Sequence, residues 1–212
     1  MNNLIKFFIE VGELKKMPKK GWVLREVKNP ETIASHTFRA VLMAWILGNR
    51  KTGLNMERLL KIALIHDLCE VYAGDTTPYD TILPKGKKKI RELMKTWPRF
   101  TEEERKKIAK DKHKKEKEAL DKLLEYLPKS TRFEMKNLWN DYESGLTPEG
   151  RFFKQADRLE NFLQAIEYWK TNKNFPQKPW WSQIRELIDE PVLLDFVGEM
   201  DKEFHSDRKP KI

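Results

Sequence analysis

Residues 63–80 read ALIHDLCEVYAGDTTPYD, a stretch that places polar groups on an otherwise apolar helical face. The apolar spacing of three to four residues that starts at Met56 continues through His66 and Asp67 to Glu70. Burying a carboxylate beside an imidazole is costly unless both groups have partners. A cation that both side chains coordinate is the simplest such partner.

Two more residues of metal-binding type lie on apolar helical faces. His36 is in phase with Ala40 and Leu47, and Asp157 follows Phe153 by four residues. Three predicted helices therefore each present a ligand type to the interior. Neutral imidazole and carboxylate together suit a divalent transition metal, whereas a single inward histidine is more often an ordinary core residue. Spacing alone leaves both interpretations open.

The rest of the chain favours an all-α fold with these residues between the helices. Strand-type alternation is absent, and glycine and proline fall between periodic segments rather than inside them. Thr101 and Glu104 match a capping box. We expect helices over residues 3–14, 34–47, 55–72, 131–144, 147–173 and 190–204, and two more inside 85–122 that separate near Pro98. The segments 15–33, 74–84 and 174–181 are expected to be connectors.

The net charge of +9 arises mainly in one stretch. Residues 85–122 hold sixteen lysines and arginines against eight acidic residues. Because the acidic residues are interleaved and aromatics are sparse, the pattern favours a solvated, ion-paired helical face. The alternative is a surface that attracts anions such as nucleic acid.

Composition also bears on the compartment. The longest apolar run, at residues 40–49, is roughly half the length that a bilayer requires, so we expect no membrane partner. The first twenty residues place apolar side chains before the basic cluster, which is the wrong order for a secretory signal. Cys69 is the one cysteine, which excludes an internal disulfide and is typical of a reducing compartment. We therefore expect a single cytoplasmic domain.

Three segments together resemble a known family. They are GWVLREVKNPETIASHTFRA at 21–40, ALIHDLCEVYAGDTTPYD at 63–80, and RFFKQADRLENFLQAIEYW at 151–169. Their H…HD…D pattern resembles the HD-domain metal-dependent phosphohydrolases, and the wider match resembles the 5′-deoxynucleotidases among them. The resemblance implies one helical-bundle HD domain across 1–212, with a core at about 4–172 and a C-terminal helical extension at about 175–205.

The resemblance also implies a metal centre. His36, His66, Asp67 and Asp157 match the family's ligands for one divalent ion, which could be Co, Mn, Zn, Ni, Fe or Mg. Glu70 matches an acidic residue implicated in catalysis. Its spacing after His66 and Asp67 places it on their helical face, where it could orient water or protonate the departing sugar oxygen.

The substrate residues implied by the resemblance follow the same segments. Asp75 matches the carboxylate that accepts a hydrogen bond from the 3′-hydroxyl and crowds out a 2′-hydroxyl. The set that is expected to contact the nucleotide is Trp22, Arg25, Asp75, Thr76, Thr77 and Pro78. In the bacterial branch an arginine precedes the tryptophan and orients the phosphate, but here that position is Gly21. We expect Lys20 or Arg25 to make the phosphate contact instead.

The function that the resemblance implies is removal of the 5′-phosphate from deoxyribonucleoside 5′-monophosphates, by a homodimeric enzyme. Two alternatives remain. Other HD proteins hydrolyse triphosphates or cyclic nucleotides, and the motif does not distinguish these reactions. A non-catalytic nucleotide- or nucleic-acid-binding protein could instead use residues 85–122, with a structural metal, although nucleic acid is not the expected partner.

Overall fold

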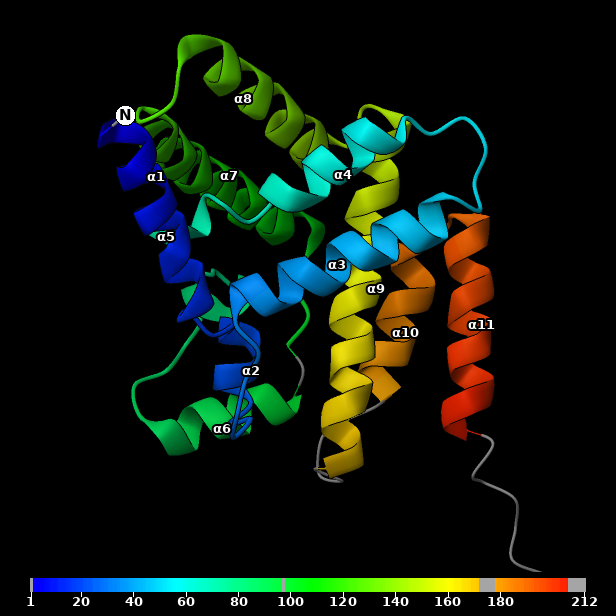
Figure 1. Cartoon of the computed structure of the whole chain (residues 1–212). Helices are drawn as coiled ribbons and strands as arrows, with labels where there is room; N and C mark the ends of the chain where they lie inside the picture. Colours follow the sequence, from blue (N-terminus) through cyan, green and yellow to red (C-terminus); the bar gives the residue numbers. More distant parts are fainter. Residues whose placement is uncertain (1, 97, 172–177, 206–212) are drawn as a thin grey trace, which may run out of the picture.

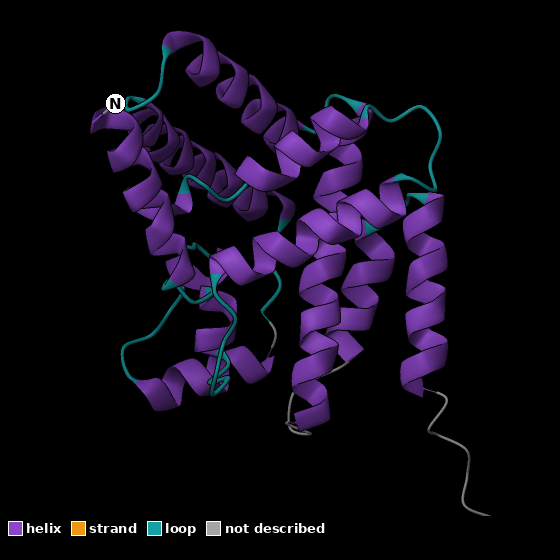
Figure 2. Ribbon diagram, viewed as in Figure 1, coloured by secondary structure: helices purple, strands orange, loops and turns teal. Residues whose placement is uncertain are grey.

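Helices make up all the regular secondary structure that the computed structural model describes, at residues 2–96, 98–171 and 178–205 (Figure 1, Figure 2). The α-helices are α1 (Asn2–Gly12), α2 (Lys20–Leu24), α3 (Ile33–Gly48), α4 (Met56–Ile65), α5 (Glu70–Ala73), α6 (Lys87–Thr96), α7 (Glu102–Leu124), α8 (Lys129–Ser144), α9 (Pro148–Thr171), α10 (Lys178–Leu187) and α11 (Pro191–His205). Two 3₁₀ turns, η1 (Glu13–Lys15) and η2 (Pro78–Thr81), complete the elements. The all-α prediction is confirmed.

The core forms where α3, α4 and α9 pack against one another, as Figure 1 shows. Helix α9 also contacts α8, α10 and α11. Ile33, Leu59, Ile62, Phe153 and Leu159 are all completely buried in this core. Burying such side chains contributes about 1.5–3 kcal/mol each. The candidate metal-binding residues lie in α3 and α9 and directly after α4, so the packing of these three helices fixes their backbones.

The predicted helix at 55–72 is wrong in one respect, because it is interrupted at the HD dipeptide. Helix α4 ends at Ile65, a turn follows, and the short α5 begins at Glu70. The imidazole Nδ1 of His66 donates to the carbonyl of Ala63, 2.8 Å away. In an unbroken helix that carbonyl would accept from the amide of Asp67. The His66 side chain thus takes the carbonyl that the Asp67 amide would otherwise bind, and the helix ends at this point.

Two expected connectors contain helices. Within residues 15–33, α2 forms a single short helix beside an isolated bridge between Pro18 and Thr32. Helix α10 begins at Lys178, inside the predicted linker at 174–181. The first part of that linker and the predicted helix end at residue 173 lie outside the described residues. Trp181 and Ile184 of α10 are buried, so packing against α9 accounts for a helix where proline and tryptophan suggested a linker.

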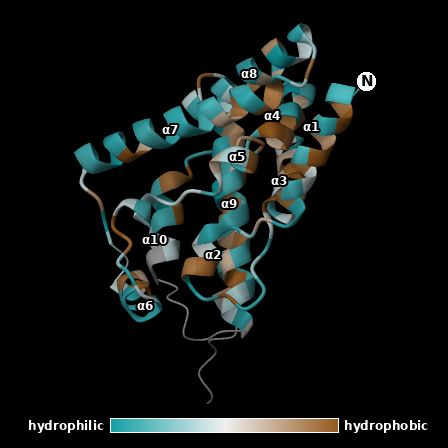
Figure 3. Ribbon diagram, turned by 90° about the vertical axis from the view of Figure 1, so that its left-hand side faces the viewer, coloured by the Kyte–Doolittle hydropathy of each residue, from teal (hydrophilic) through white to brown (hydrophobic). Residues whose placement is uncertain are grey.

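The basic stretch forms α6 and α7, which separate near Pro98 as predicted. The capping box of Thr101 and Glu104 is present at the start of α7. Figure 3 shows that α7 is hydrophilic along most of its length. Ion pairs spaced by four residues follow this helix, between Lys106 and Glu102 and between Lys117 and Asp121. These contacts match the expected ion-paired face.

Among the described residues, no helix has both the length and the apolar character that crossing a bilayer requires.

Candidate metal centre and substrate pocket

Four donor atoms from three parts of the chain converge in the interior. The Nε2 atoms of His36 and His66 lie 3.3 Å apart. Asp157 Oδ1 lies 2.9 Å from the first of them and 3.9 Å from the second. Asp67 Oδ2 lies 3.8 Å and 3.2 Å from the same two atoms. The structure therefore brings together all four residues that the sequence singled out.

Both imidazoles are fully buried, and each is oriented through its other ring nitrogen. His66 Nδ1 donates to the carbonyl of Ala63, and His36 Nδ1 contacts the buried carboxylate of Glu160. Arg39 Nε donates to the second oxygen of Glu160 at 2.7 Å. Such contacts at Nδ1 direct the Nε2 lone pair toward a metal in many metalloproteins. The two Nε2 atoms point to the common centre for this reason.

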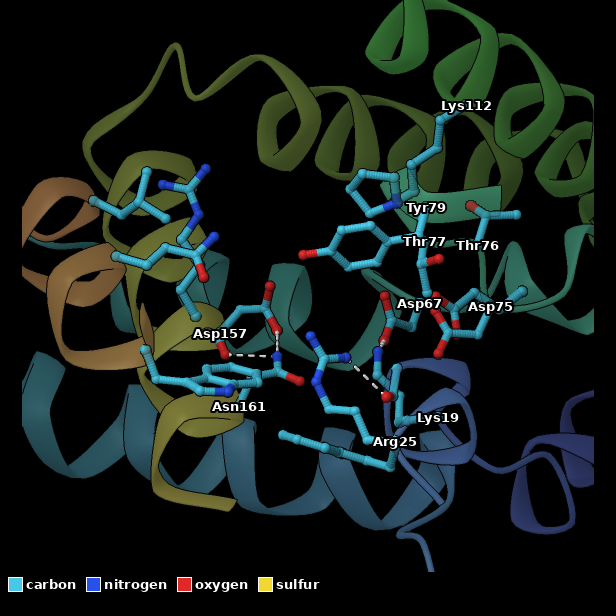
Figure 4. Close-up of a pocket in the computed structure, with 18 of the residues that line it drawn as sticks. Lys19, Arg25, Asp67, Asp75, Thr76, Thr77, Tyr79, Lys112, Asp157 and Asn161 are labelled. Carbon is cyan, nitrogen blue, oxygen red and sulfur yellow. Dashed lines mark hydrogen bonds and ion pairs between the residues drawn. The ribbon is translucent and has the colours of Figure 1, made fainter. Parts of the chain in front are cut away.

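Asp157 is held on two sides. Tyr142 donates its hydroxyl to Asp157 Oδ2 at 3.0 Å. Asn161, one helical turn further along α9, donates from Nδ2 to Asp157 Oδ1 at 3.2 Å. In Figure 4 Asp157 and Asn161 lie side by side on α9. These two contacts fix the carboxylate with Oδ1 toward the histidines.

The charges of the cluster keep both aspartates ionised. Burial raises the pKa of Asp67, but His66 and Lys19 outweigh burial and hold the value well below its usual range. Burial likewise raises the pKa of Asp157, whereas the hydrogen bond and charge of His36 hold it far below its usual range. Burial and Lys19 lower the pKa of His36, yet its contacts with Asp157 and Glu160 raise it to about 10. A cation that binds here therefore displaces a proton from His36.

The donor set fits one divalent transition-metal ion. Ligand atoms that surround an ion at about 2.1 Å lie roughly 3.0–3.4 Å apart in octahedral or tetrahedral geometry. The separations between an imidazole Nε2 and the other donor atoms are 2.9–3.9 Å and bracket that range. Donor atoms of His36, His66 and Asp67 all lie within 4.8 Å of one another. Two neutral imidazole nitrogens and two carboxylates would leave a net charge near zero around a dication. The chemistry and spacing of the residues thus agree with the metal centre that the sequence predicts.

Glu160→Gln is expected to weaken divalent-metal binding about 10- to 100-fold, the usual cost of losing a partner of a metal-binding histidine. The amide keeps the shape of Glu160 but removes the negative charge beside His36 Nδ1. Calorimetric titration with Mn²⁺ measures the change. Glu167→Gln is the matched control, because Glu167 binds the same Arg39 at 2.9 Å and has an exposed side chain. Equal affinities for the two variants would contradict the assigned role.

A cavity of about 420 Å³ opens beside the metal-donor cluster (Figure 4). Asp67 and Asp157 form part of its wall. All the expected substrate and catalytic residues line it, namely Trp22, Arg25, Glu70, Asp75, Thr76, Thr77 and Pro78. The volume lies within the range of small-ligand pockets. Two of the predicted metal-binding residues and all the predicted substrate and catalytic residues therefore border the same cavity.

Glu70 lines this cavity with 2% of its surface exposed. Its Oε2 atom is buried and accepts no hydrogen bond within the described structure. Burial and the neighbouring charge of Asp67 raise the pKa of Glu70 well above its ordinary value. A carboxylic acid whose pKa is raised keeps its proton to a higher pH and can then donate it. The geometry therefore suits the catalytic role predicted for this residue.

The loop after α5 forms another wall. Asp75 Oδ2 accepts from the backbone amide of Lys20 at 2.5 Å, which ties the loop to α2. Thr77 Oγ1 donates to Asp80 Oδ1 at 2.7 Å, and Asp80 Oδ2 binds the ammonium of Lys20 at 2.6 Å. These contacts hold the loop in place with its polar side chains beside the cavity.

Trp22 and Arg25 lie in an aromatic part of the wall. Trp22 is stacked on Trp180 with ring centroids 5.4 Å apart and donates from Nε1 to Glu31. The Arg25 guanidinium lies 5.4 Å from the Trp180 ring and 5.8 Å from that of Tyr79. Only 2% of Trp22 is exposed, so it supports the pocket from behind more than it offers an open face. The substrate roles of both residues stay predictions.

Several cavity residues were missing from the sequence prediction. They are Lys19, Tyr79, Lys112, Tyr142, Arg158, Asn161, Trp180, Gln183, Ile184 and Leu187. Asn161 had a readable signal, because it follows Asp157 by four residues and shares its helical face. Lys112 and Tyr142 had none, since they come from α7 and α8 and reach the cavity only through tertiary packing.

The chain is similar to known proteins in sequence and in fold. A family described as HD domain matches residues 11–188. A Xenopus laevis protein named 5′-deoxynucleotidase HDDC2 is 34% identical over 205 residues, which cover 96% of this chain and 89% of that protein. The human protein of the same name is 31% identical, with 95% and 86% coverage. A conserved hypothetical protein of known structure from Pyrococcus furiosus is 25% identical, with a TM-score of 0.58 and coverage of 86% of this chain and 96% of that one.

Proposed function

The chain belongs to the HD domain family, and from this premise we propose that it is a phosphoric monoester hydrolase that converts deoxyribonucleoside 5′-monophosphates to nucleoside and phosphate. One observation carries the proposal above all. The four donor atoms of His36, His66, Asp67 and Asp157 meet at the wall of a nucleotide-sized cavity, with the buried acid Glu70 beside them.

The metal-binding residues would hold a single divalent ion, which supplies charge neutralisation for the phosphate and activates water for attack at phosphorus. Hydrolysis forms a bond from the water oxygen to phosphorus and breaks the bond from phosphorus to O5′. The departing oxygen must gain a proton. Glu70 is the proposed donor, because its buried carboxyl has a raised pKa and lines the cavity. The proton that the attacking water loses returns to Glu70, so that its acid form is restored.

The sugar is proposed to lie against the loop at residues 75–78. Asp75 would accept a hydrogen bond from the 3′-hydroxyl, and Thr76, Thr77 and Pro78 would border the same part of the nucleotide. The backbone amide of Lys20 fixes Asp75, so the carboxylate is in position before substrate arrives. A preset carboxylate discriminates between hydroxyl patterns because an unmatched polar group would be left unpaired.

A substrate and metal panel tests the function. The chain is stripped with EDTA and then assayed for phosphate release from deoxy- and ribonucleoside monophosphates, nucleoside triphosphates and cyclic nucleotides. Co, Mn, Zn, Ni, Fe and Mg are supplied in turn, because the donor set suits several of these ions. We expect release from deoxynucleoside monophosphates only after a metal is returned. Hydrolysis confined to triphosphates or cyclic nucleotides would refute the monophosphatase assignment.

We further propose that the enzyme is a cytoplasmic homodimer. Phe38 and Trp45 lie seven residues apart on α3, and their exposure of 68% and 53% supports a contact surface between copies. The sole cysteine, Cys69, is free and buried, as is usual in reducing compartments. Sedimentation velocity of the purified chain distinguishes a dimer from a monomer.

A further inference from the structure

Two lysines of the cavity are set among its carboxylates. Lys19 precedes α2, and its ammonium lies 3.1 Å from Asp67 Oδ2 with 13% of the side chain exposed. Lys112 comes from α7, and its ammonium lies 3.3 Å from the buried Glu116. In Figure 4, Lys19 lies below Asp67, at the residue just before α2, and Lys112 extends from α7 above Asp67. Both line the cavity.

The carboxylates that line the cavity would repel a phosphate unless positive groups were also present. Asp67, Asp75 and Asp157 line the cavity as carboxylates. A phosphate monoester is a dianion near neutral pH, and it would be repelled in a partly desolvated site unless positive groups faced it. A single divalent ion is already neutralised by the two aspartates that would hold it. Further positive charge must come from the chain itself.

Lys20 and Arg25, which the sequence suggested as phosphate contacts, form contacts with other groups of the protein. The ammonium of Lys20 binds Asp80 at 2.6 Å, and Lys20 does not line the cavity. Arg25 does line it, but its NH1 donates to the carbonyl of Gly21 at 2.9 Å and its guanidinium lies between aromatic rings. This arrangement places Arg25 in the aromatic wall. Lys19, in contrast, is hydrogen-bonded to a member of the metal-donor cluster itself.

We propose that Lys19 and Lys112 bind the phosphate of the substrate. An ammonium has three donors. The contact with Asp67 uses one donor of Lys19, and the contact with Glu116 uses one donor of Lys112, so each retains donors for phosphate oxygens. Because Lys19 touches Asp67, a phosphate that it binds lies next to the metal-donor atoms. This inference rests on the proposed function for the identity of the ligand.

The test measures binding rather than turnover. Lys19→Met and Lys112→Met keep the apolar stem and remove the charge. Each is expected to weaken binding of inorganic phosphate and of thymidine 5′-monophosphate to the Mn²⁺-loaded protein about 10- to 100-fold, as loss of a charge-assisted hydrogen bond implies. Binding of thymidine, which lacks the phosphate, should not change. Lys19→Arg and Lys112→Arg should restore much of the phosphate affinity.

Lys16→Met and Lys117→Met are the matched controls, because both lysines are exposed and pair with acidic neighbours on the surface. Titration with Mn²⁺ separates a phosphate contact from a defect in the metal centre. Lys19→Met should bind Mn²⁺ at least as well as the wild type, since it removes a cation from Asp67. Unchanged phosphate binding, or phosphate and Mn²⁺ affinities that fall together, would overturn the proposal.

The outcome is separable from that of the proposed function. If the wild type releases phosphate from deoxynucleotides but the lysine variants bind phosphate normally, the function stands and the lysine assignment fails. If the wild type hydrolyses no deoxynucleotide but the lysines still account for phosphate binding, the lysine assignment stands and the hydrolase assignment fails.

Discussion

Replacing Asp67 with alanine is expected to abolish metal-dependent phosphate release from deoxynucleoside monophosphates, by more than about 10³-fold, the upper end of what one electrostatic group contributes to an active site. Asp67 Oδ2 lies 3.2 Å from His66 Nε2 and 3.8 Å from His36 Nε2. Its removal takes away one of two anionic donors and leaves Lys19 unpaired beside the cluster. His66→Ala should have the same effect. Phosphate release and Mn²⁺ content are measured together.

The matched control for this prediction is Asp121→Ala, which removes a half-buried carboxylate of α7. Asp121 pairs with Lys117 and Lys136 and is remote from the cavity lining. It should leave activity and metal content unchanged. Retained metal-dependent activity in Asp67→Ala or in His66→Ala would rule out this cluster as the hydrolytic centre.

Glu70→Gln is expected to retain the metal but to lower the turnover rate about 10²- to 10⁴-fold, the range attributed to general acid–base catalysis. Glu70 contributes a proton only while it is protonated. Because its pKa is raised well above the ordinary value, the acid form persists to a higher pH than in a free glutamate, and wild-type activity should fall as the pH rises through that raised pKa. The activity of the glutamine variant should not show this decrease at alkaline pH. Rate constants across pH and Mn²⁺ titration measure both effects.

Glu57→Gln serves as the comparison for Glu70→Gln, because Glu57 lies on the neighbouring helix α4 with 76% of its side chain exposed. It should behave as the wild type does at every pH. An unchanged turnover rate in Glu70→Gln, or a matching loss of bound metal, would remove Glu70 from the chemical step.

Much of the fold was predictable because local signals were strong. The helical periodicity around His36, His66 and Asp157 placed each residue on an inward face, and α3, α4 and α9 do pack with those faces together. The Thr101 capping box correctly located the start of α7. Local patterns succeed here because burial and capping act within one or two turns of a helix.

The errors arose where side-chain hydrogen bonds or tertiary contacts override helical periodicity. The break after Ile65 depends on a side-chain hydrogen bond from His66 to Ala63, which periodicity does not encode. Helix α10 forms because Trp181 and Ile184 are buried in the hydrophobic core, although the sequence at its start suggested a linker. Lys19 escaped notice because only folding brings it to Asp67, 48 residues away along the chain.

Titration of the metal-free protein with Mn²⁺, followed by phosphate release from thymidine 5′-monophosphate, tests the central claim most directly. Activity should be absent after stripping with EDTA, should rise linearly with added Mn²⁺, and should saturate at one ion per chain. Asp67→Ala should remain inactive throughout the titration. Activity that survives complete removal of metal, or that appears equally in Asp67→Ala, would contradict a hydrolytic centre built from His36, His66, Asp67 and Asp157.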